Sequence, residues 1–376
     1  MKLKRFCAKD LRNISDISID FKDGVNLLFG SNAQGKTNAI EGIYLFARGK
    51  SFRKARESDL IRFGCEGFRA EIVYETKAGE QTLSYALFGG ERKRMKNGYK
   101  LERVSEMIGS FRAVLFTPDH LSLVKDGPEE RRAFLDVAIC QCKPYYLSAY
   151  TNYKRALEQR NCLLRSMGKG QAVDLNEIYA WSRSLAEYAA PIYYERRDYI
   201  KRLEKHARTV MKEISEEKET LSLRYKCDIG YDGDDIEKIK EAYYGLFVSD
   251  IPREAANMST LFGIGRDDME ILINGHRARA FASQGQQRSV VLAMKLAEGE
   301  VCLELTGEYP VFLFDDVLSE LDESRRSYLL KNKNGRQIVI TSCDQKEIAD
   351  FSEALIRVSD GTFTPVKDTS AGAEER

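Results

Sequence analysis

The strongest constraint on the architecture of this chain comes from the segment VNLLFGSNAQGKTNAIEGIYLFAR, residues 25–48. Its apolar start predicts a strand over Val25–Phe29, and the glycine-bounded GSNAQGKT of residues 30–37 predicts a loop. The apolar residues that follow have the spacing of one helix face. Strand, glycine-bounded loop and helix in this order are the context that a phosphate-binding loop requires, because the loop N–H groups and the helix N-terminus attract phosphate oxygens. The segment therefore predicts a nucleotide site in an α/β fold.

Two side chains of this loop are predicted to act on the nucleotide directly. Lys36 is expected to neutralise the β and γ phosphates as part of the catalytic machinery, and the Thr37 hydroxyl is expected to ligate Mg²⁺. The sequence therefore predicts ATP and Mg²⁺ as cofactors. The residues expected to contact ATP are Gly30, Ser31, Asn32, Ala33, Gln34, Gly35, Lys36 and Thr37.

A loop of this kind needs a carboxylate on a neighbouring strand to hold the metal, and the best candidate lies far along the chain. An apolar strand predicted over Val311–Phe314 ends in Asp315 and Asp316. Asp315 is expected to bind Mg²⁺ through water, and Asp316 is expected to polarise the attacking water as a catalytic carboxylate. Many ATPases of this architecture carry glutamate at the second position, so the shorter side chain of Asp316 indicates slow hydrolysis.

An inserted helical arm explains the long separation between the loop and the Asp pair. A helix is predicted to start at Pro128, with Glu129 and Glu130 in its first turn, and strand signals are absent from there to about Tyr231. Sheet-like sequence returns near Met269. We therefore expect mixed sheets with helices, divided into an N-terminal part of an ATPase head (residues 1–120), an inserted, mostly helical arm (121–259), a C-terminal part of the head (260–366) and a disordered tail (367–376).

One row of apolar residues in the arm has the spacing of a single helix face. Successive members are three or four residues apart, which is typical of a short coiled-coil seam. An ordinary amphipathic bundle helix gives the same pattern over two heptads, so both interpretations stay open. The row consists of Ile200, Leu203, Ala207, Val210 and Ile214.

Two further motifs flank the Asp pair. SQGQQRS, residues 283–289, opens a helix with apolar periodicity, and SELD, residues 319–322, follows the pair. In this order and spacing they resemble the signature motif, Walker B strand and D-loop of the ABC-type ATPase heads. The resemblance implies that ATP is held between the phosphate loop of one subunit and the signature serine, Ser283, of another, so that ATP drives homodimerisation. Gln286 of the same motif is expected to contact the nucleotide.

Within that superfamily the chain resembles the RecF family, the bacterial recombination-mediator ATPases related to the heads of the structural-maintenance-of-chromosomes (SMC) proteins. The resemblance covers nearly the whole chain, and its third stretch is the most specific because general ATPase chemistry does not demand it. The stretches are LRNISDISIDF (residues 11–21), GSNAQGKTNAIEGIYLFARGKSFR (30–53), PDHLSLVKDGPEERRAFLD (118–136), and SQGQQR with DDVLSELD (283–288 and 315–322).

Resemblance to the RecF family implies a weak, DNA-stimulated ATPase that acts as a molecular switch. It implies dimerisation on ATP, binding of double-stranded DNA and of gapped DNA at single-strand/double-strand junctions, and cooperation with the RecO and RecR proteins to help load the RecA recombinase. The implied processes are DNA repair, recombination, maintenance of replication and the SOS response to DNA damage. Arg12 and Asn13 match a pair that lies beside the nucleotide in this family.

Two features depart from the pattern of these ATPase heads. A Q-loop glutamine, which is a usual magnesium ligand, is not identifiable between the phosphate loop and the arm. The switch histidine expected after a strand over residues 337–340 is absent, and Thr341 and Ser342 stand in its place. The sequence therefore leaves the γ-phosphate sensor unassigned.

A DNA-binding surface has to be local, because 59 Lys and Arg residues against 58 Asp and Glu residues give a net charge of only +1. Two basic clusters are candidates, although each could equally be a solvated face. No helix-turn-helix, zinc or aromatic single-strand motif accompanies them, so we expect recognition of DNA shape and backbone. Asn97 and Gly98 beside the second cluster predict a hairpin turn. The cationic residues are Lys50, Arg53, Lys54 and Arg56 in the first cluster, and Arg92, Lys93, Arg94 and Lys96 in the second.

The remaining composition fits a cytoplasmic protein without a membrane partner. The eight cysteines have no paired metal spacing and predict reduced thiols, and no apolar run is long enough to cross a membrane. Three alternatives to the DNA-binding switch stay open: a transport ATPase subunit, which the inserted arm and missing glutamine disfavour, a structural clamp that binds ATP with negligible turnover, and a generic ABC-type ATPase.

Overall fold

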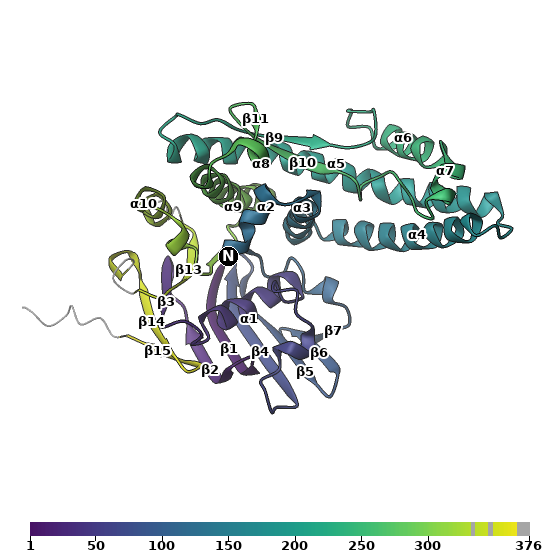
Figure 1. The fold of residues 1–376 in the computed structure, drawn as a ribbon. Helices are drawn as coiled ribbons and strands as arrows, with labels where there is room; N and C mark the ends of the chain where they lie inside the picture. The colour runs from purple at the N-terminus through teal and green to yellow at the C-terminus, as the bar shows by residue number, and fades with distance from the viewer. Residues whose placement is uncertain (332–334, 345–348, 367–376) are drawn as a thin grey trace, which may run out of the picture.

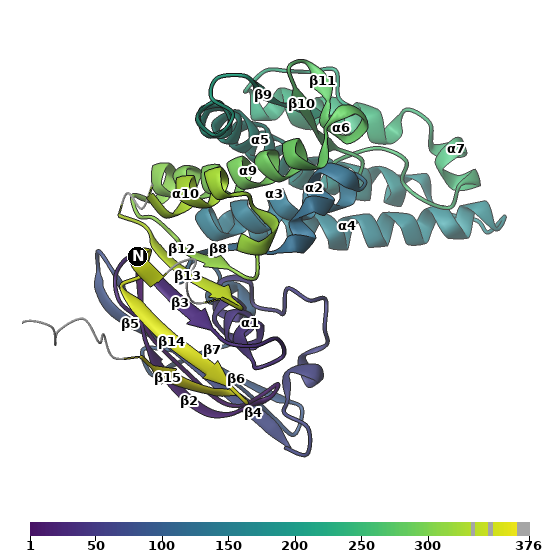
Figure 2. The ribbon, with the colours of Figure 1, turned by 60° about the vertical axis from the view of Figure 1, so that its left-hand side comes forward.

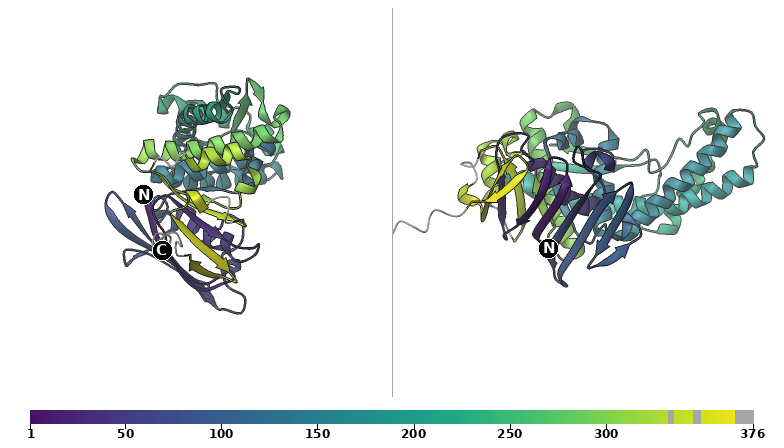
Figure 3. Two further views of the ribbon diagram at one scale, coloured as in Figure 1. Left: turned by 90° about the vertical axis from the view of Figure 1, so that its left-hand side faces the viewer. Right: turned by 90° about the horizontal axis from the view of Figure 1, so that it is seen from below.

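The computed structural model describes residues 1–331, 335–344 and 349–366. The two larger sheets form one body, and most helices lie together on one side of it (Figures 1 and 2). Two long helices, α4 and α5, project away from the sheets as an arm, which is clearest in the view from below (Figure 3). Residues 367–376, for which the sequence predicts a disordered tail, lie outside the described residues.

The first sheet is antiparallel and has six strands in the order β2-β1-β4-β5-β6-β7. Burial alternates along its strands, so one face packs in a hydrophobic core and the other faces solvent. The predicted turn at Asn97 and Gly98 is confirmed, because Lys96 pairs with Tyr99 across it. The strands are β1 (Lys2–Leu11), β2 (Ile14–Asp20), β4 (Gly67–Thr76), β5 (Gly79–Phe88), β6 (Glu91–Lys96) and β7 (Tyr99–Leu101).

The second sheet joins the two ends of the chain in the order β15-β14-β3-β13-β12-β8. Five of its strands are parallel, and the central ones are apolar and almost wholly buried because both faces are covered. The strands are β3 (Val25–Phe29), β8 (Ala113–Phe116), β12 (Val311–Phe314), β13 (Gln337–Ser342), β14 (Ala354–Ser359) and the antiparallel β15 (Thr362–Pro365).

Helix α1 (Lys36–Arg48) lies between the two sheets. Its apolar residues share one hydrophobic core with the inner face of the antiparallel sheet and with Leu28, Leu313 and Val339 of the parallel sheet. The helix therefore fixes the loop that precedes it against strands from both ends of the chain. The predicted strand, loop and helix over residues 25–48 are confirmed.

Most helices and a small third sheet form the second body and the arm. The longest helix, α5, contacts α4, α6 and α9. The helices are α2 (Ser122–Lys125), α3 (Pro128–Cys142), α4 (Pro144–Gly168), α5 (Leu175–Ile214), α6 (Ile236–Val248), α7 (Ile251–Ala256), α8 (Ala278–Phe281), α9 (Gln284–Thr306) and α10 (Glu323–Lys331); the small sheet has β9 (Leu221–Lys226), β10 (Asp268–Ile273) and β11 (His276–Arg277). Short 3₁₀ turns are η1 (Glu57–Leu60), η2 (Val104–Glu106), η3 (Pro118–Leu121), η4 (Leu318–Glu320) and η5 (Ala349–Phe351).

The apolar row on α5 is part of a bundle within one chain. Ile200, Leu203, Ala207 and Val210 are buried in the same core as residues of α9, and Ile214 packs against its edge. The bundle interpretation is therefore confirmed, and the coiled-coil interpretation is wrong for this segment. None of the helices among the described residues is both long and apolar enough to cross a membrane.

Two secondary-structure expectations are wrong. β9 lies in a region where the sequence indicated no strand, and it exists because its residues pair with β10 of a distant segment. β13 ends at Ser342 rather than at residue 340, since Thr341 and Ser342 continue the parallel pairing with β3.

Candidate functional site

The glycine-bounded loop between β3 and α1 is shaped by its backbone. Gly30 and Gly35 have φ angles of 156° and 113°, and Ala33 has a φ of 64°. A Cβ atom on Gly30 would lie 2.2 Å from the Val358 carbonyl oxygen, so no larger residue fits there. Gln34 ties the loop to the turn between β14 and β15 by accepting hydrogen bonds from the backbone there. The loop is therefore held in a curled form, while Ser31, Asn32 and Ala33 remain exposed.

The Lys36 ammonium lies in the hollow of this loop. Its Nζ donates to the carbonyl oxygens of Gly30 at 2.5 Å and Ser31 at 2.9 Å, and the side chain is buried. A cation enclosed by a loop at a helix N-terminus is the arrangement that binds phosphate groups. The residues present thus fit a nucleoside triphosphate.

The predicted metal corner is assembled from the two ends of the chain. Thr37 at the start of α1 donates from Oγ1 to Oδ1 of Asp315 at 2.9 Å. Burial raises the pKa of Asp315, while hydrogen bonds from Thr341 and Thr37 oppose that rise. A hydroxyl and a carboxylate, both hard oxygen ligands, suit Mg²⁺.

Asp316 differs sharply from its neighbour. It is exposed, its φ is 54°, and its N–H donates to Oγ1 of Thr341 at 2.8 Å. Among the described residues, its carboxylate makes no hydrogen bond or ion pair. The backbone of Asp316 is therefore fixed while its carboxylate remains available to solvent.

β13 ends at Ser342, two residues later than expected, and Cys343 directly follows it. Its Sγ lies 3.8 Å from Nζ of Lys36 and 2.8 Å from Oδ1 of Asn32. Thr341, which the sequence suggested beyond the strand, is within the strand and fully buried. Both residues adjoin the site. Sequence reasoning placed Thr341 where the switch histidine was expected but gave it no role, and it did not single out Cys343, because both positions depend on where β13 ends.

Arg12 and Asn13 flank the loop from the turn between β1 and β2. Arg12 makes two hydrogen bonds, of 2.9 and 2.8 Å, to the buried carboxylate of Glu41 on α1. Asn13 accepts from Nδ2 of Asn38 at 2.8 Å. Both side chains thus brace α1 and the loop.

The residues that directly follow the edge strand β8 include no glutamine. β8 is the neighbour of β12, and it is followed by Thr117, Pro118, Asp119 and His120. Some of these residues line a cleft of 490 Å³ that also receives Arg53 and Lys54. The described residues that directly follow β8 therefore offer no glutamine as a Q-loop candidate.

Ser283 and Gln286 form the N-terminal cap of α9. Oγ of Ser283 accepts from the Gln286 N–H at 3.2 Å, and Oε1 of Gln286 accepts from the Ser283 N–H at 2.8 Å. Nε2 of Gln286 donates to Glu219 at 2.7 Å. In the part of the chain that the structure describes, no hydrogen bond or ion pair links these two residues to residues 30–37.

An ion pair between Arg92 and Glu57 of η1 connects the two basic clusters, but most of their cations have partners within the chain. Arg53 donates to Asn38 at 3.1 Å, and Lys54 pairs with Glu130 at 2.9 Å. The Arg94 guanidinium lies over the Tyr85 ring, and Lys96 donates to Ser110 at 3.0 Å. At Arg56 the backbone N–H, not the guanidinium, donates to Asp59, at 2.9 Å.

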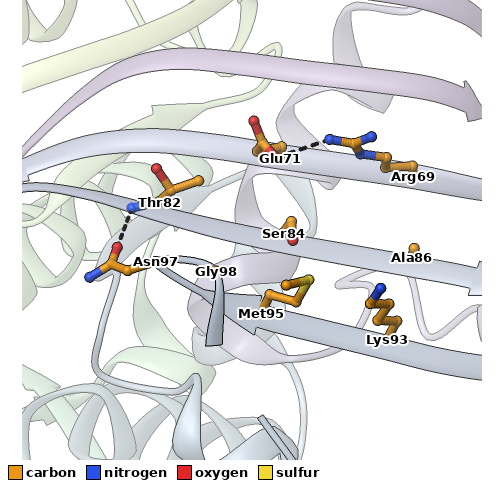
Figure 4. Close-up of a pocket in the computed structure, with 9 residues that line it drawn as sticks. All are labelled: Arg69, Glu71, Thr82, Ser84, Ala86, Lys93, Met95, Asn97 and Gly98. Atoms are coloured by element: carbon orange, nitrogen blue, oxygen red, sulfur yellow. Dashed lines mark hydrogen bonds and ion pairs between the residues drawn. The ribbon is translucent and has the colours of Figure 1, made fainter. Parts of the chain in front are cut away.

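Lys93 lies on the opposite face of β6 from Arg92 and Arg94. It lines a shallow hollow of 350 Å³ on the solvent face of the antiparallel sheet, together with Arg69 and Glu71 of β4 (Figure 4). The second cluster is therefore divided between two faces, as the alternation of a strand requires.

Lys50 lies in a group of like charges. Burial, followed by the nearby charges of Arg48 and Lys154, lowers its pKa. Lys154 belongs to α4, so this group joins the end of α1 to the arm. Neither basic cluster identified in the sequence includes Lys154, because it lies in a distant segment of the chain.

Comparisons with known proteins agree with this geometry. Residues 2–363 match the family model described as "RecF/RecN/SMC N terminal domain". The DNA replication and repair protein RecF of Clostridioides difficile (strain 630) is 36% identical over 360 residues, which are 95% of this chain and 96% of that protein. RecF of Macrococcus caseolyticus (strain JCSC5402) is 36% identical over 368 residues, covering 97% and 100%.

Solved structures show the same fold. A structure of "the recombination mediator protein RecF-ATPrS in RecFOR pathway" superposes with a TM-score of 0.91 at 32% identity and covers 97% of this chain and 98% of that one. An SMC head domain from Pyrococcus furiosus shares the fold alone, with a TM-score of 0.57 at 17% identity over 97% of this chain and 96% of that one.

Fold, site geometry and the family match together define a P-loop ATPase head of the ABC and SMC type, with an inserted and mostly helical arm. The similarity over almost the full length narrows this class further. The chain belongs to the RecF family.

Proposed function

We propose that this protein is an ATP-dependent DNA-binding switch of the RecF type. The hydrogen bond between Thr37 and Asp315 is the observation that carries the proposal, because it joins the phosphate loop to the Asp pair across almost the whole sequence. The proposed nucleotide contacts are residues 30–37, together with Arg12 and Asn13 beside them. Gln286, in the cap at the start of α9, is a further proposed contact. Related RecF structures described as bound to ATP and ATPrS support ATP as the ligand.

In the proposed mechanism, each residue has a limited task. Lys36 and the loop N–H groups hold the phosphates, and Thr37 and Asp315 would hold Mg²⁺, which supplies positive charge against the triphosphate. The exposed Asp316 carboxylate accepts a hydrogen bond from the attacking water. Ser283 of a second copy would contact the γ-phosphate, so that ATP binding and dimerisation are coupled.

DNA is the proposed second ligand of the switch. The like-charge group of Arg48, Lys50 and Lys154 favours an anion such as the phosphate backbone, and Arg69 and Lys93 offer a second basic position. The RecFOR pathway named for the related structures supports RecO and RecR as partners. The proposal extends to gapped junctions as the DNA substrate and to help in loading the RecA recombinase as the outcome, as resemblance to the RecF family implies.

Light scattering tests this function directly. The protein is measured without nucleotide, with ADP, and with ATP and Mg²⁺, each with and without gapped duplex DNA. We expect dimers only with ATP, strengthened by DNA, and no ATP response in Lys36→Ala, which lacks the phosphate-binding ammonium. A wild-type monomer that ignores ATP and DNA would refute the proposal.

A structural clamp with negligible turnover is the second candidate. The short, exposed side chain of Asp316 favours it, because its carboxylate reaches less far than that of glutamate. The Asp316→Asn variant distinguishes the two: a hydrolase should accumulate as a stable ATP dimer after this change, whereas a clamp should dimerise and dissociate as the wild type does.

A further inference from the structure

Thr341 is a buried polar residue on the strand that lies between the strand before the phosphate loop and the strand before the Asp pair. It lies on β13, which pairs with β3 on one side and β12 on the other, and its side chain is fully buried. Its Oγ1 donates to Oδ1 of Asp315 at 2.9 Å. The same oxygen accepts the N–H of Asp316 at 2.8 Å. One hydroxyl therefore contacts both members of the Asp pair.

These two hydrogen bonds use both functions of the hydroxyl. Burying an unsatisfied polar group is costly, so a threonine here is stable only because donor and acceptor are both engaged. Valine has nearly the same shape and would suit a buried parallel strand equally well. Packing alone thus gives no reason for an oxygen atom at this position.

The contact to Asp315 controls the orientation of its carboxylate. Oδ1 of Asp315 accepts from Thr37 as well as from Thr341, and no hydrogen bond to Oδ2 occurs among the described residues. In the proposed ATP complex the Thr37 hydroxyl would turn to the metal. Thr341 would then be the side chain that still fixes the rotation of the Asp315 carboxylate.

The contact to Asp316 controls its backbone. Asp316 has a φ of 54°, a left-handed conformation that is uncommon for residues other than glycine, although aspartate adopts it more readily than most. The Thr341 oxygen takes the N–H of Asp316 in this conformation, and the hydroxyl of Ser319 donates to its carbonyl oxygen at 3.1 Å. Loss of the Thr341 contact would release the peptide that aims the Asp316 carboxylate.

We propose that Thr341 is a positioning residue for ATP hydrolysis, which orients Asp315 toward the metal and fixes the backbone of Asp316 through one hydroxyl. This inference rests on the proposed function of the Asp pair and gives a role to a residue that the sequence left without one. Partners that orient metal ligands in this way typically change metal affinity or activity 10- to 100-fold when they are removed.

The test compares Thr341→Val, which removes the oxygen and keeps the shape, with Thr341→Ser, which keeps the hydroxyl. Ile340→Val, a buried change on the same strand, controls for packing. Binding of a fluorescent ATP analogue is titrated with and without Mg²⁺, turnover gives kcat and KM, and thermal unfolding monitors the fold. Wild-type protein and Lys36→Ala are measured alongside.

We expect Thr341→Val to bind nucleotide normally without Mg²⁺, to need roughly 10-fold more Mg²⁺ for its metal-dependent gain in affinity, and to lose roughly 10- to 100-fold in kcat with little change in KM. Thr341→Ser and Ile340→Val should both keep the wild-type Mg²⁺ dependence and kcat. If wild type binds ATP with Mg²⁺ but Thr341→Val matches it in metal dependence and kcat, the positioning role is refuted alone. If wild type binds no ATP, the proposed function fails and this role fails with it.

Discussion

At the residue scale, His120 shows how burial turns one side chain into a pH-dependent contribution to stability. The imidazole lies beside the site at the end of β8, and Nδ1 accepts from the Thr117 N–H at 3.0 Å. Burial, followed by the charge of Lys295, lowers the pKa of His120 well below its ordinary value of 6.5. The ring is therefore neutral in the folded protein.

This pKa predicts a loss of stability in acid. Below about pH 6.5 the unfolded chain binds a proton at this histidine and the folded chain does not, so the unfolding free energy falls as pH falls, by up to about 1.4 kcal/mol per pH unit. Urea unfolding between pH 7.5 and pH 5.5, a range chosen around that ordinary pKa of 6.5, measures the slope. His120→Asn, whose amide oxygen can still accept from Thr117, should show a shallower slope, and the exposed His276→Asn should not. Equal slopes for wild type and His120→Asn would contradict the prediction.

Individual residues of the site differ in how far the sequence predicts them. The glycines, Lys36 and Thr37 could be predicted because phosphate binding demands those residue types at that spacing. Thr341 and Cys343 could not, since their approach to the site depends on the end of β13. The cation clusters suggested Lys54 as a DNA contact, whereas its partner Glu130 comes from a helix far along the chain.

At the element scale, the arm is held together by buried polar contacts as well as by apolar packing. Arg160 of α4 is fully buried and donates to Glu254 of α7 at 2.6 Å, to Ser182 of α5 at 2.9 Å and to the carbonyl oxygen of Phe247 of α6 at 2.5 Å. Four helices therefore meet at the guanidinium of Arg160. The spacing of apolar residues in the sequence does not predict this contact.

Removing this guanidinium should destabilise the arm. Arg160→Met leaves Glu254 buried without its counter-ion, which costs about 3–5 kcal/mol. Urea unfolding followed by circular dichroism measures the change. Arg155→Met on the exposed face of α4 is the matched control, expected within about 0.5 kcal/mol of wild type. The double change Arg160→Met with Glu254→Leu should recover most of the loss, and an Arg160→Met variant as stable as wild type would contradict the account.

Elements with local signals could be predicted and those formed by distant pairing could not. Glycine positions and apolar spacing predict the strand, loop and helix at residues 25–48. Pro128 predicts the start of α3. β9 has only a short alternating segment, and its partner β10 is far away in sequence. The apolar row on α5 predicted a buried face but not which helix would cover it.

At the scale of the whole molecule, strands from both ends of the chain form one sheet, while the cap of Ser283 and Gln286 lies at the start of α9. β3 from the N-terminal part lies beside β13 and β14 from the C-terminal part. Ser283 is exposed at the start of α9 and has no hydrogen bond or ion pair to residues 30–37 in the described part of the chain. Under the proposed function, the phosphate loop of one copy and Ser283 of another would form one nucleotide site when two copies associate.

Ser283 therefore offers a test of association that leaves each copy intact. Ser283→Asp keeps an N-cap acceptor for the Gln286 N–H but adds a negative charge, whereas Ser283→Arg adds bulk and loses the cap, worth about 1 kcal/mol. Both variants should bind ATP as monomers like wild type, because residues 30–37 are unchanged. A like charge facing the γ-phosphate costs several kcal/mol, so Ser283→Asp should need protein concentrations higher by on the order of a hundredfold or more to dimerise with ATP. Light scattering over a concentration series measures this, with Ser148→Arg on the exposed face of α4 as a control for added bulk. Dimerisation of Ser283→Asp at the wild-type concentrations would mean that Ser283 does not face the nucleotide of a second copy, and the shared site would have to be abandoned even if each monomer binds ATP.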